Sequence, residues 1–180
     1  MIKYSCFVLI LLGSFSQMDA QNILSAHGGL NYSSVSSKNS INPDAIFGIN
    51  AGFAYKYYVD DLGWSLTPEI NFSQEGFKNL RLDYINIPLS VGFDFTSTFN
   101  FSVGFQYAYL LTNTSEIQDV MEKSNFAFLV SFEFFPTDRF VTGLRFANGI
   151  KDILKAPYQA IDEANTYSIQ FYVGYNLFAK

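Results

Sequence analysis

The chain has 180 residues and a formal net charge of −5, and 49% of its residues are hydrophobic, 18% aromatic and only 15% charged. This composition is too apolar for a disordered chain and fits one folded domain. The acidic balance argues against a nucleic-acid partner, because binding phosphates needs basic surface. One histidine and one cysteine exclude a zinc cluster of the usual ligand number and a disulfide framework.

The first twenty residues, Met1–Ala20, are typical of a cleaved secretory signal. Lys3 gives a positive start, Phe7–Leu12 is an apolar core, and Met18–Ala20 is an imperfect small-residue cleavage site. The apolar stretch is too short to span a bilayer as a helix, and no run of about 18 apolar residues follows it. We therefore expect one folded domain over residues 21–180.

Alternation of period two dominates that domain and is clearest in Asn100–Leu111. There the large residues Phe101 and Phe105 share one face, while Ser102 and Gln106 share the other, as in a strand. The same pattern predicts eight strands, each of about the 9–11 residues that a tilted strand needs to cross a bilayer. Their ranges are Leu24–Tyr32, Phe47–Val59, Leu62–Phe72, Asp83–Phe95, Asn100–Leu111, Phe126–Phe134, Phe140–Phe146 and Tyr167–Phe178.

The connections between these strands alternate between short and long. Tight turns are expected at Asp60–Asp61, Thr96–Thr98 and Pro136–Asp138. Long polar connections are expected at Ser33–Ile46, Ser73–Leu82, Thr112–Asn125 and Gly149–Thr166. Bacterial outer-membrane barrels have short periplasmic turns and long outer loops, so this order predicts both termini in the periplasm.

The two faces of the strands indicate which environment each one meets. The polar face carries mostly Gly, Ser, Asn, Gln and Thr, and the apolar face carries large aromatic residues. An eight-stranded barrel is just wide enough to be filled by side chains, so small polar residues suit its interior and bulky ones its exterior. The sequence therefore predicts an all-β fold, an eight-stranded antiparallel up-and-down transmembrane β-barrel in a bacterial outer membrane. A soluble lipocalin-like barrel or a sandwich is the alternative.

A membrane barrel has lipid as its first partner and depends on the barrel-assembly machinery. Its aromatic residues are expected to gather into girdles at both interfaces. The predicted periplasmic girdle is Tyr57, Trp64, Phe95, Phe99, Phe134, Phe140 and Tyr175, and the outer one is Tyr32, Phe47, Phe72, Tyr109 and Tyr167. Pro68 and Pro88 fall inside strands, where each removes a ladder donor, so local bulges are expected there.

The few charged residues of the polar face are the candidate functional residues. Glu69, Arg145, Gln106 and Gln170 are predicted at similar mid-barrel depth, with Lys56, Asp94 and Glu133 as a second set nearer the periplasm. Strands three and seven are opposite in an eight-membered ring, so Glu69 and Arg145 are expected to meet across the lumen. Buried charges must be paired. An ion-pair network that fills the barrel is the leading interpretation, and a gate in a narrow conduction path is the alternative.

Catalysis has little support. His27 is the only histidine and shares a face with Ser25, which resembles a fragment of a hydrolase site. Because this face is predicted to point inward, we interpret His27 as a polar lumen residue. No catalytic residue, cofactor or metal is predicted. The long loops, above all Glu116–Lys123 and Lys151–Ala164, are candidate surfaces for a protein or other surface ligand, and a solvated loop is the alternative.

Three segments show a family resemblance. Leu82–Leu89 resembles the Y-I/L-x-I/V-P-L strand of the PorT-like outer-membrane β-barrel family of Bacteroidota. Pro68–Gly76 resembles that family's E-L-x-Y-S-x-x-G strand, and Arg145–Ile153 its R-Y-x-x-G-L-x-D-I segment. The resemblance implies an outer-membrane barrel without implying a secretion role. The expected function is structural or interaction-based, with a narrow channel or transport component as the alternative and a lipid-acting enzyme as a third.

Overall fold

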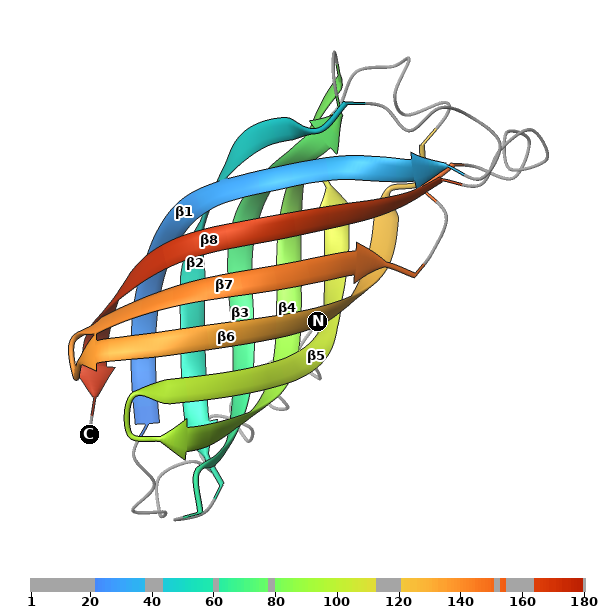
Figure 1. Cartoon of the computed structure of the whole chain (residues 1–180). Coiled ribbons are helices and arrows are strands. Elements are labelled where there is room, and N and C mark those ends of the chain that lie inside the picture. Colours follow the sequence, from blue (N-terminus) through green and yellow to red (C-terminus); the bar gives the residue numbers. More distant parts are fainter. Residues whose placement is uncertain are drawn as a thin grey trace, which may run out of the picture.

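The computed structural model describes residues 22–37, 44–59, 62–77, 80–112, 121–150, 153–154 and 164–179. Eight strands form one sheet in which each strand pairs antiparallel with the next, and β1 pairs with β8 to close a barrel (Figure 1). This confirms the predicted eight-stranded antiparallel barrel. The strands are β1 (Asn22–Ser37), β2 (Ile46–Tyr58), β3 (Trp64–Phe77), β4 (Leu80–Thr96), β5 (Phe99–Leu110), β6 (Ser124–Thr137), β7 (Phe140–Gly149) and β8 (Ala164–Ala179).

The two ends of the barrel differ. The end that holds the β2–β3, β4–β5 and β6–β7 connections and the end of β8 is termed the turn end, and the opposite one the loop end (Figure 1). Turns follow β4 at Ser97–Thr98 and β6 at Asp138–Arg139, while the expected turn at Asp60–Asp61 lies outside the described residues. Among the described residues, no helix is long and apolar enough to cross a bilayer.

The predicted long connection at Ser73–Leu82 is wrong. The β3–β4 ladder continues from the pair Ser73 and Tyr84 to the pair Phe77 and Leu80, so only two residues separate the strands. Strand pairing requires only backbone hydrogen bonds. The two strands therefore remain paired beyond the point at which the alternation of apolar and polar residues ends. Gly76, with a φ of 129°, takes a conformation there that other residues rarely adopt.

The expected bulges at Pro68 and Pro88 are also wrong. The β2–β3 register is the same on both sides of Pro68, at Ala54↔Glu69 and Tyr57↔Leu66, and the β4–β5 register runs unbroken through Pro88↔Gln106. Each proline lacks one N–H, which removes a single ladder bond without displacing its neighbours. Register shifts occur instead near strand ends, at Leu24/Ser25, Asp94/Thr96 and Phe134/Thr137.

The barrel is apolar outside and polar inside. On the outer face Phe105 is 61% exposed and Phe171 53% exposed, whereas Asn31 and Gln170 in the interior are at most 1% exposed. A soluble protein with this many exposed Phe, Leu and Ile side chains would carry a large apolar surface in water. In a bilayer the same surface meets acyl chains, and closure leaves no sheet edge unpaired.

Candidate functional site in the barrel lumen

The middle of the lumen is crossed by one ion pair. Arg145 on β7 places Nη2 2.6 Å from Oε1 of Glu69 on β3, and each side chain is 3% exposed. The Nε of Arg145 also donates to Ser131 Oγ on β6 at 3.1 Å. Because β3 and β7 lie opposite one another in the ring of eight, this pair bridges the lumen across its width.

A second ion pair lies nearer the turn end. Lys56 Nζ on β2 is 2.6 Å from Glu133 Oε2 on β6, and it sits 4.6 Å from the centroid of the Phe135 ring. The Tyr172 hydroxyl donates to Glu133 Oε1 at 2.9 Å, and the Arg145 guanidinium lies 5.3 Å from the centroid of the same tyrosine ring. Tyr172 therefore joins the two ion pairs into one network.

Tyr172 is a lumen residue that was not predicted from the sequence. Tyr172 lies at an even position of β8, like Gln170 and Asn176, so the period-two pattern places its side chain inside. Because tyrosine is also common on the lipid-facing side, its residue type did not indicate a lumen position. Its register partner on β7 is Gly143, and a Cβ on that glycine would overlap the tyrosine ring. The glycine thus lets the ring lie against the strand and extend its hydroxyl to Glu133.

We expect Tyr172→Phe to lower the free energy of unfolding by about 1.5–3 kcal/mol, because the variant keeps the ring but loses a hydrogen bond to a charged group. Urea unfolding of the refolded barrel, followed by circular dichroism, measures this change. Tyr109→Phe on the outer face is the matched control and should change stability by less than about 0.5 kcal/mol. Equal effects of the two substitutions would contradict the role assigned to Tyr172.

Asp94 does not join the Lys56–Glu133 pair. Its Oδ2 accepts from the Tyr58 hydroxyl at 2.8 Å and its Oδ1 from Asn100 Nδ2 at 2.6 Å, close to the turn end. The second predicted set is therefore split into an ion pair and a separate acid with neutral donors.

The two predicted glutamines lie in the interior, where Gln170 on β8 is the cross-strand partner of Arg145 on β7. Gln106 is 3% exposed and Gln170 is 1% exposed. Neither Gln106 Oε1 nor Gln170 Nε2 has a hydrogen-bond partner. The mid-lumen set therefore contains one charged pair, with the glutamines beside it as neutral polar groups.

Ser25 and His27 lie on the lumen face of β1, and each is 9% exposed. The His27 ring centroid is 5.2 Å from that of Tyr172, so the histidine packs on the residue that links the ion pairs. Its surroundings are those of an interior side chain. Among the described residues, no group of three or more His, Cys, Asp or Glu side chains is arranged to hold a metal ion.

A separate chain of hydrogen bonds runs through the lumen toward the loop end and finishes on the Glu75 carboxylate. Asn50 donates to Asn31 Oδ1 at 2.6 Å, Asn31 donates to Ser73 Oγ at 2.7 Å, and Ser73 donates to Glu75 Oε1 at 2.8 Å. The same Glu75 oxygen accepts from Asn86 at 3.3 Å. Glu75 was missed because the sequence analysis assigned it to a loop, and the lengthened β3 brings it inside.

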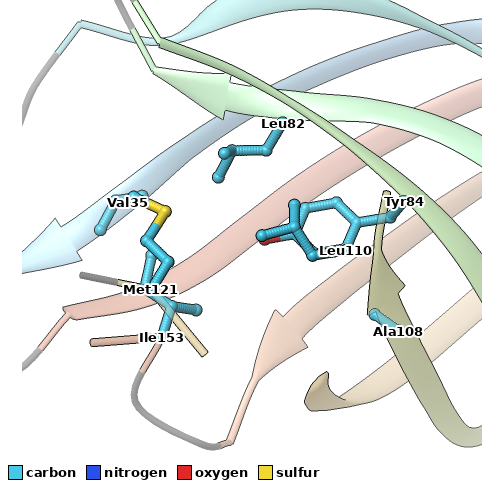
Figure 2. Packing of buried hydrophobic residues seen from close by; sticks show 7 residues of the cluster. All are labelled: Val35, Leu82, Tyr84, Ala108, Leu110, Met121 and Ile153. Atoms are coloured by element: carbon cyan, nitrogen blue, oxygen red, sulfur yellow. The ribbon is translucent and has the colours of Figure 1, made fainter. Parts of the chain in front are cut away.

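An apolar cluster closes the lumen at the loop end. Figure 2 shows Leu82 and Tyr84 of β4 turned toward Leu110 of β5, with Met121 and Ile153 from the connecting segments beside them. The segments are held together by a bridge between Met121 and Leu154. Together with Val35 and Ala108 these residues form the loop-end cluster, and all of them are buried.

This closure changes the expectation for two predicted binding loops. Within Glu116–Lys123 and Lys151–Ala164, the described residues Met121 and Ile153 face inward and are at most 6% exposed. Residues 113–120, 151–152 and 155–163 lie outside the described part of the chain. The apolar residues that suggested an adhesive surface are in these two cases part of the barrel's own packing.

Comparison with known proteins places the chain in a family. The sequence model of a family described as outer membrane protein beta-barrel domain matches residues 15–155. The chain belongs to this family. No curated protein matches its sequence.

Solved structures agree with this outer-membrane barrel assignment. Ail, the attachment invasion locus protein of Yersinia pestis, has a TM-score of 0.54 at 14% identity, and the match covers 88% of this chain and 99% of Ail. Neisserial surface protein A has a TM-score of 0.59 at 10% identity, over 86% of this chain and 97% of that one. A second Ail structure, in complex with the heparin analogue sucrose octasulfate, has a TM-score of 0.50 at 17% identity, over 88% and 99%. At these identities the likeness is one of fold.

The girdle residues of this outer-membrane barrel all lie on its outer face. Nine of the twelve are exposed, and Tyr57, Phe72 and Tyr167 are half-buried. Neighbouring strands bring several rings together, with centroid distances of 4.9 Å for Phe99 and Phe134 and 5.2 Å for Tyr32 and Phe47. That these rings mark the two membrane interfaces stays a prediction.

Proposed function

We propose that this protein is an integral outer-membrane scaffold with a closed lumen, which acts through the surface at its loop end. The observation that carries the proposal is the double obstruction of the lumen. The Glu69–Arg145 pair crosses its middle, and the loop-end cluster covers its mouth. A path for solutes would have to break a buried ion pair and displace a packed apolar group, and each step costs several kcal/mol.

The runner-up is a narrow channel, and unpartnered polar groups inside the lumen favour it. Gln106 Oε1, Gln170 Nε2 and Arg145 Nη1 are buried without a hydrogen-bond partner. Such groups are commonly served by buried water, and water in a lumen is a first requirement for conduction. A chain of isolated waters differs from a conducting path, so flux decides between the two functions.

The test is permeation through vesicles that contain the purified full-length protein. We expect no ion or small-sugar flux above that of protein-free vesicles, because both obstructions are in place. An open porin reconstituted at the same density is the positive control. Steady flux or discrete conductance steps from the wild-type barrel would overturn the closed-lumen function and favour the channel.

The net charge of the chain disfavours one class of ligand at the loop end, the polyanions. Ail, a barrel of the same fold, has been solved with a polyanion, sucrose octasulfate. This chain carries a net charge of −5, which opposes binding of such a ligand through general electrostatic attraction. We therefore propose a protein or other surface component as the partner, with the outer connections as the contact surface.

The proposal also includes the subfamily to which the chain belongs and the route by which it is exported. The segments Leu82–Leu89 and Arg145–Ile153 support a PorT-like member of this family from the Bacteroidota. Met1–Ala20 supports export by a cleaved signal, followed by insertion through the barrel-assembly machinery. N-terminal sequencing of the protein from outer membranes should begin at Gln21 or within a few residues of it. An intact Met1 would contradict cleavage.

A further inference from the structure

Glu75 is a buried acid that forms no ion pair with the described residues. It is 7% exposed, and its Oε1 accepts hydrogen bonds from Ser73 and Asn86, which are both neutral. The salt bridges that the structure shows between described lumen residues join Lys56 with Glu133 and Arg145 with Glu69, and neither includes Glu75. Neutral donors reduce the cost of burying a carboxylate but leave its charge uncompensated.

A small cavity adjoins this carboxylate. Its volume of about 10 Å³ is enough for one particle the size of a water molecule. Its polar lining includes Glu75, Gln106, Asn125 and Ser168, which come from β3, β5, β6 and β8. Tyr84 and Ala108, both labelled in Figure 2, belong to this lining and also to the loop-end cluster, so the cavity borders the apolar closure.

The unpartnered polar atoms of the lining are oxygens. Gln106 Oε1, Asn125 Oδ1 and Ser168 Oγ are buried without a hydrogen-bond partner, in side chains that are at least 95% buried. Asn125 donates its amide N–H to Thr166 Oγ1 at 3.1 Å, which leaves its carbonyl oxygen available. The cavity thus gathers one carboxylate and three neutral oxygens, a ligand set suited to a hard cation.

We propose that this cavity binds one alkali cation, Na⁺ or K⁺, on the Glu75 carboxylate, with the oxygens of Gln106, Asn125 and Ser168 as further ligands. A monovalent ion balances the single carboxylate, whereas Ca²⁺ in a site with one acid would leave an uncompensated positive charge. A water molecule would satisfy the oxygens without balancing the carboxylate. The cation therefore stabilises the folded barrel, since the site does not exist in the unfolded chain.

The test is the dependence of thermal stability on the cation present. The full-length barrel is refolded in a non-ionic detergent at pH 8, in parallel in NaCl, KCl or choline chloride of equal ionic strength, because the loop-end cluster would slow exchange after folding. We expect Tm to be about 3 °C higher in about 100 mM Na⁺ or K⁺ than in choline, whose cation is too large for the cavity. The difference between the Tm values in NaCl and KCl shows which of the two ions the cavity prefers.

Glu75→Gln should remove this difference, because the amide keeps the shape and loses the charge. Asp138→Asn, which removes an equal charge from the exposed β6–β7 turn, should retain it. Equal Tm values of the wild type in all three salts, or a difference that survives in Glu75→Gln, would overturn the site and indicate a cavity that holds water only or a protonated acid.

A second measurement covers the case in which Glu75→Gln fails to refold. Wild-type barrel refolded in Na⁺ and then passed rapidly through a desalting column into choline chloride should retain close to one Na⁺ per chain, measured by flame emission, because the buried ion exchanges slowly. Barrel refolded in choline chloride and treated in the same way is the blank. An equal Na⁺ content in the two preparations would also overturn the proposal. None of these results depends on whether the lumen conducts.

Discussion

Glu69→Ala is expected to lower the free energy of unfolding by about 3–5 kcal/mol. The substitution leaves the Arg145 guanidinium in the middle of the lumen, 2% exposed, and of its hydrogen bonds to the described residues the one to Ser131 remains. Removing one member of a buried ion pair leaves an uncompensated charge, which costs more than the pair itself contributes. Denaturant unfolding of barrels refolded in lipid vesicles, followed by tryptophan fluorescence, gives the change directly.

Two variants make the result specific to the pair. Asp138→Ala removes an exposed acid in the β6–β7 turn and should change stability by less than about 0.5 kcal/mol. Replacing Glu69 by Gln together with Arg145 by Met removes both charges and should recover part of the loss. An unchanged midpoint for Glu69→Ala, accompanied by a higher conductance, would show instead that the pair acts as a gate.

Phe105→Arg is expected to destabilise the barrel by about 2–4 kcal/mol, which is the cost of placing a cation on the lipid face near the bilayer midplane. Phe105 lies in the middle of β5, is 61% exposed, and packs its ring 5.9 Å from that of Phe128. In water, a change at so exposed a position would have little effect. The same unfolding assay in vesicles measures it.

The control for this substitution is Ser97→Arg in the β4–β5 turn, where the side chain is exposed outside the sheet. It introduces the same charge at a level where water is available, so the stability should stay within about 0.5 kcal/mol of the wild type. If Phe105→Arg behaved like Ser97→Arg, the outer face would be in contact with water, and the membrane assignment of β5 would fail.

The sequence was most informative where one face of a strand must be apolar. In β5 and β8 the alternation placed Phe105 and Phe171 outside and Gln106 and Gln170 inside, as the structure has them. The position of β3 opposite β7, which lets Glu69 meet Arg145 across the lumen, followed from the order of eight strands in a closed ring. Each of these inferences depends on a period of two, which lipid on one side and a narrow lumen on the other enforce.

The sequence was least informative at the loop end and for bonds between strands. Beyond the apolar zone the alternation fades while the ladder continues, so Glu75 was assigned to a loop and its cavity was not foreseen. Tyr172 was obscured because a tyrosine suits either face. Asp94 bonds to Tyr58 and not to Lys56, and this choice depends on how far each side chain extends, which the strand register does not determine. The closure by Met121 and Ile153 brings together segments about thirty residues apart in the sequence.

The most direct measurement tests whether the aromatic side chains of the outer face contact lipid. Trp64 is the single tryptophan, is 47% exposed on the outer face, and lies at the start of β3. In vesicles, its fluorescence should be quenched by lipids brominated near the carbonyl end of the acyl chain and should resist acrylamide in the water. In Trp64→Phe/Phe105→Trp, deep bromines should quench most strongly. Quenching by acrylamide with no response to bromines at any depth would contradict a barrel whose aromatic face meets lipid.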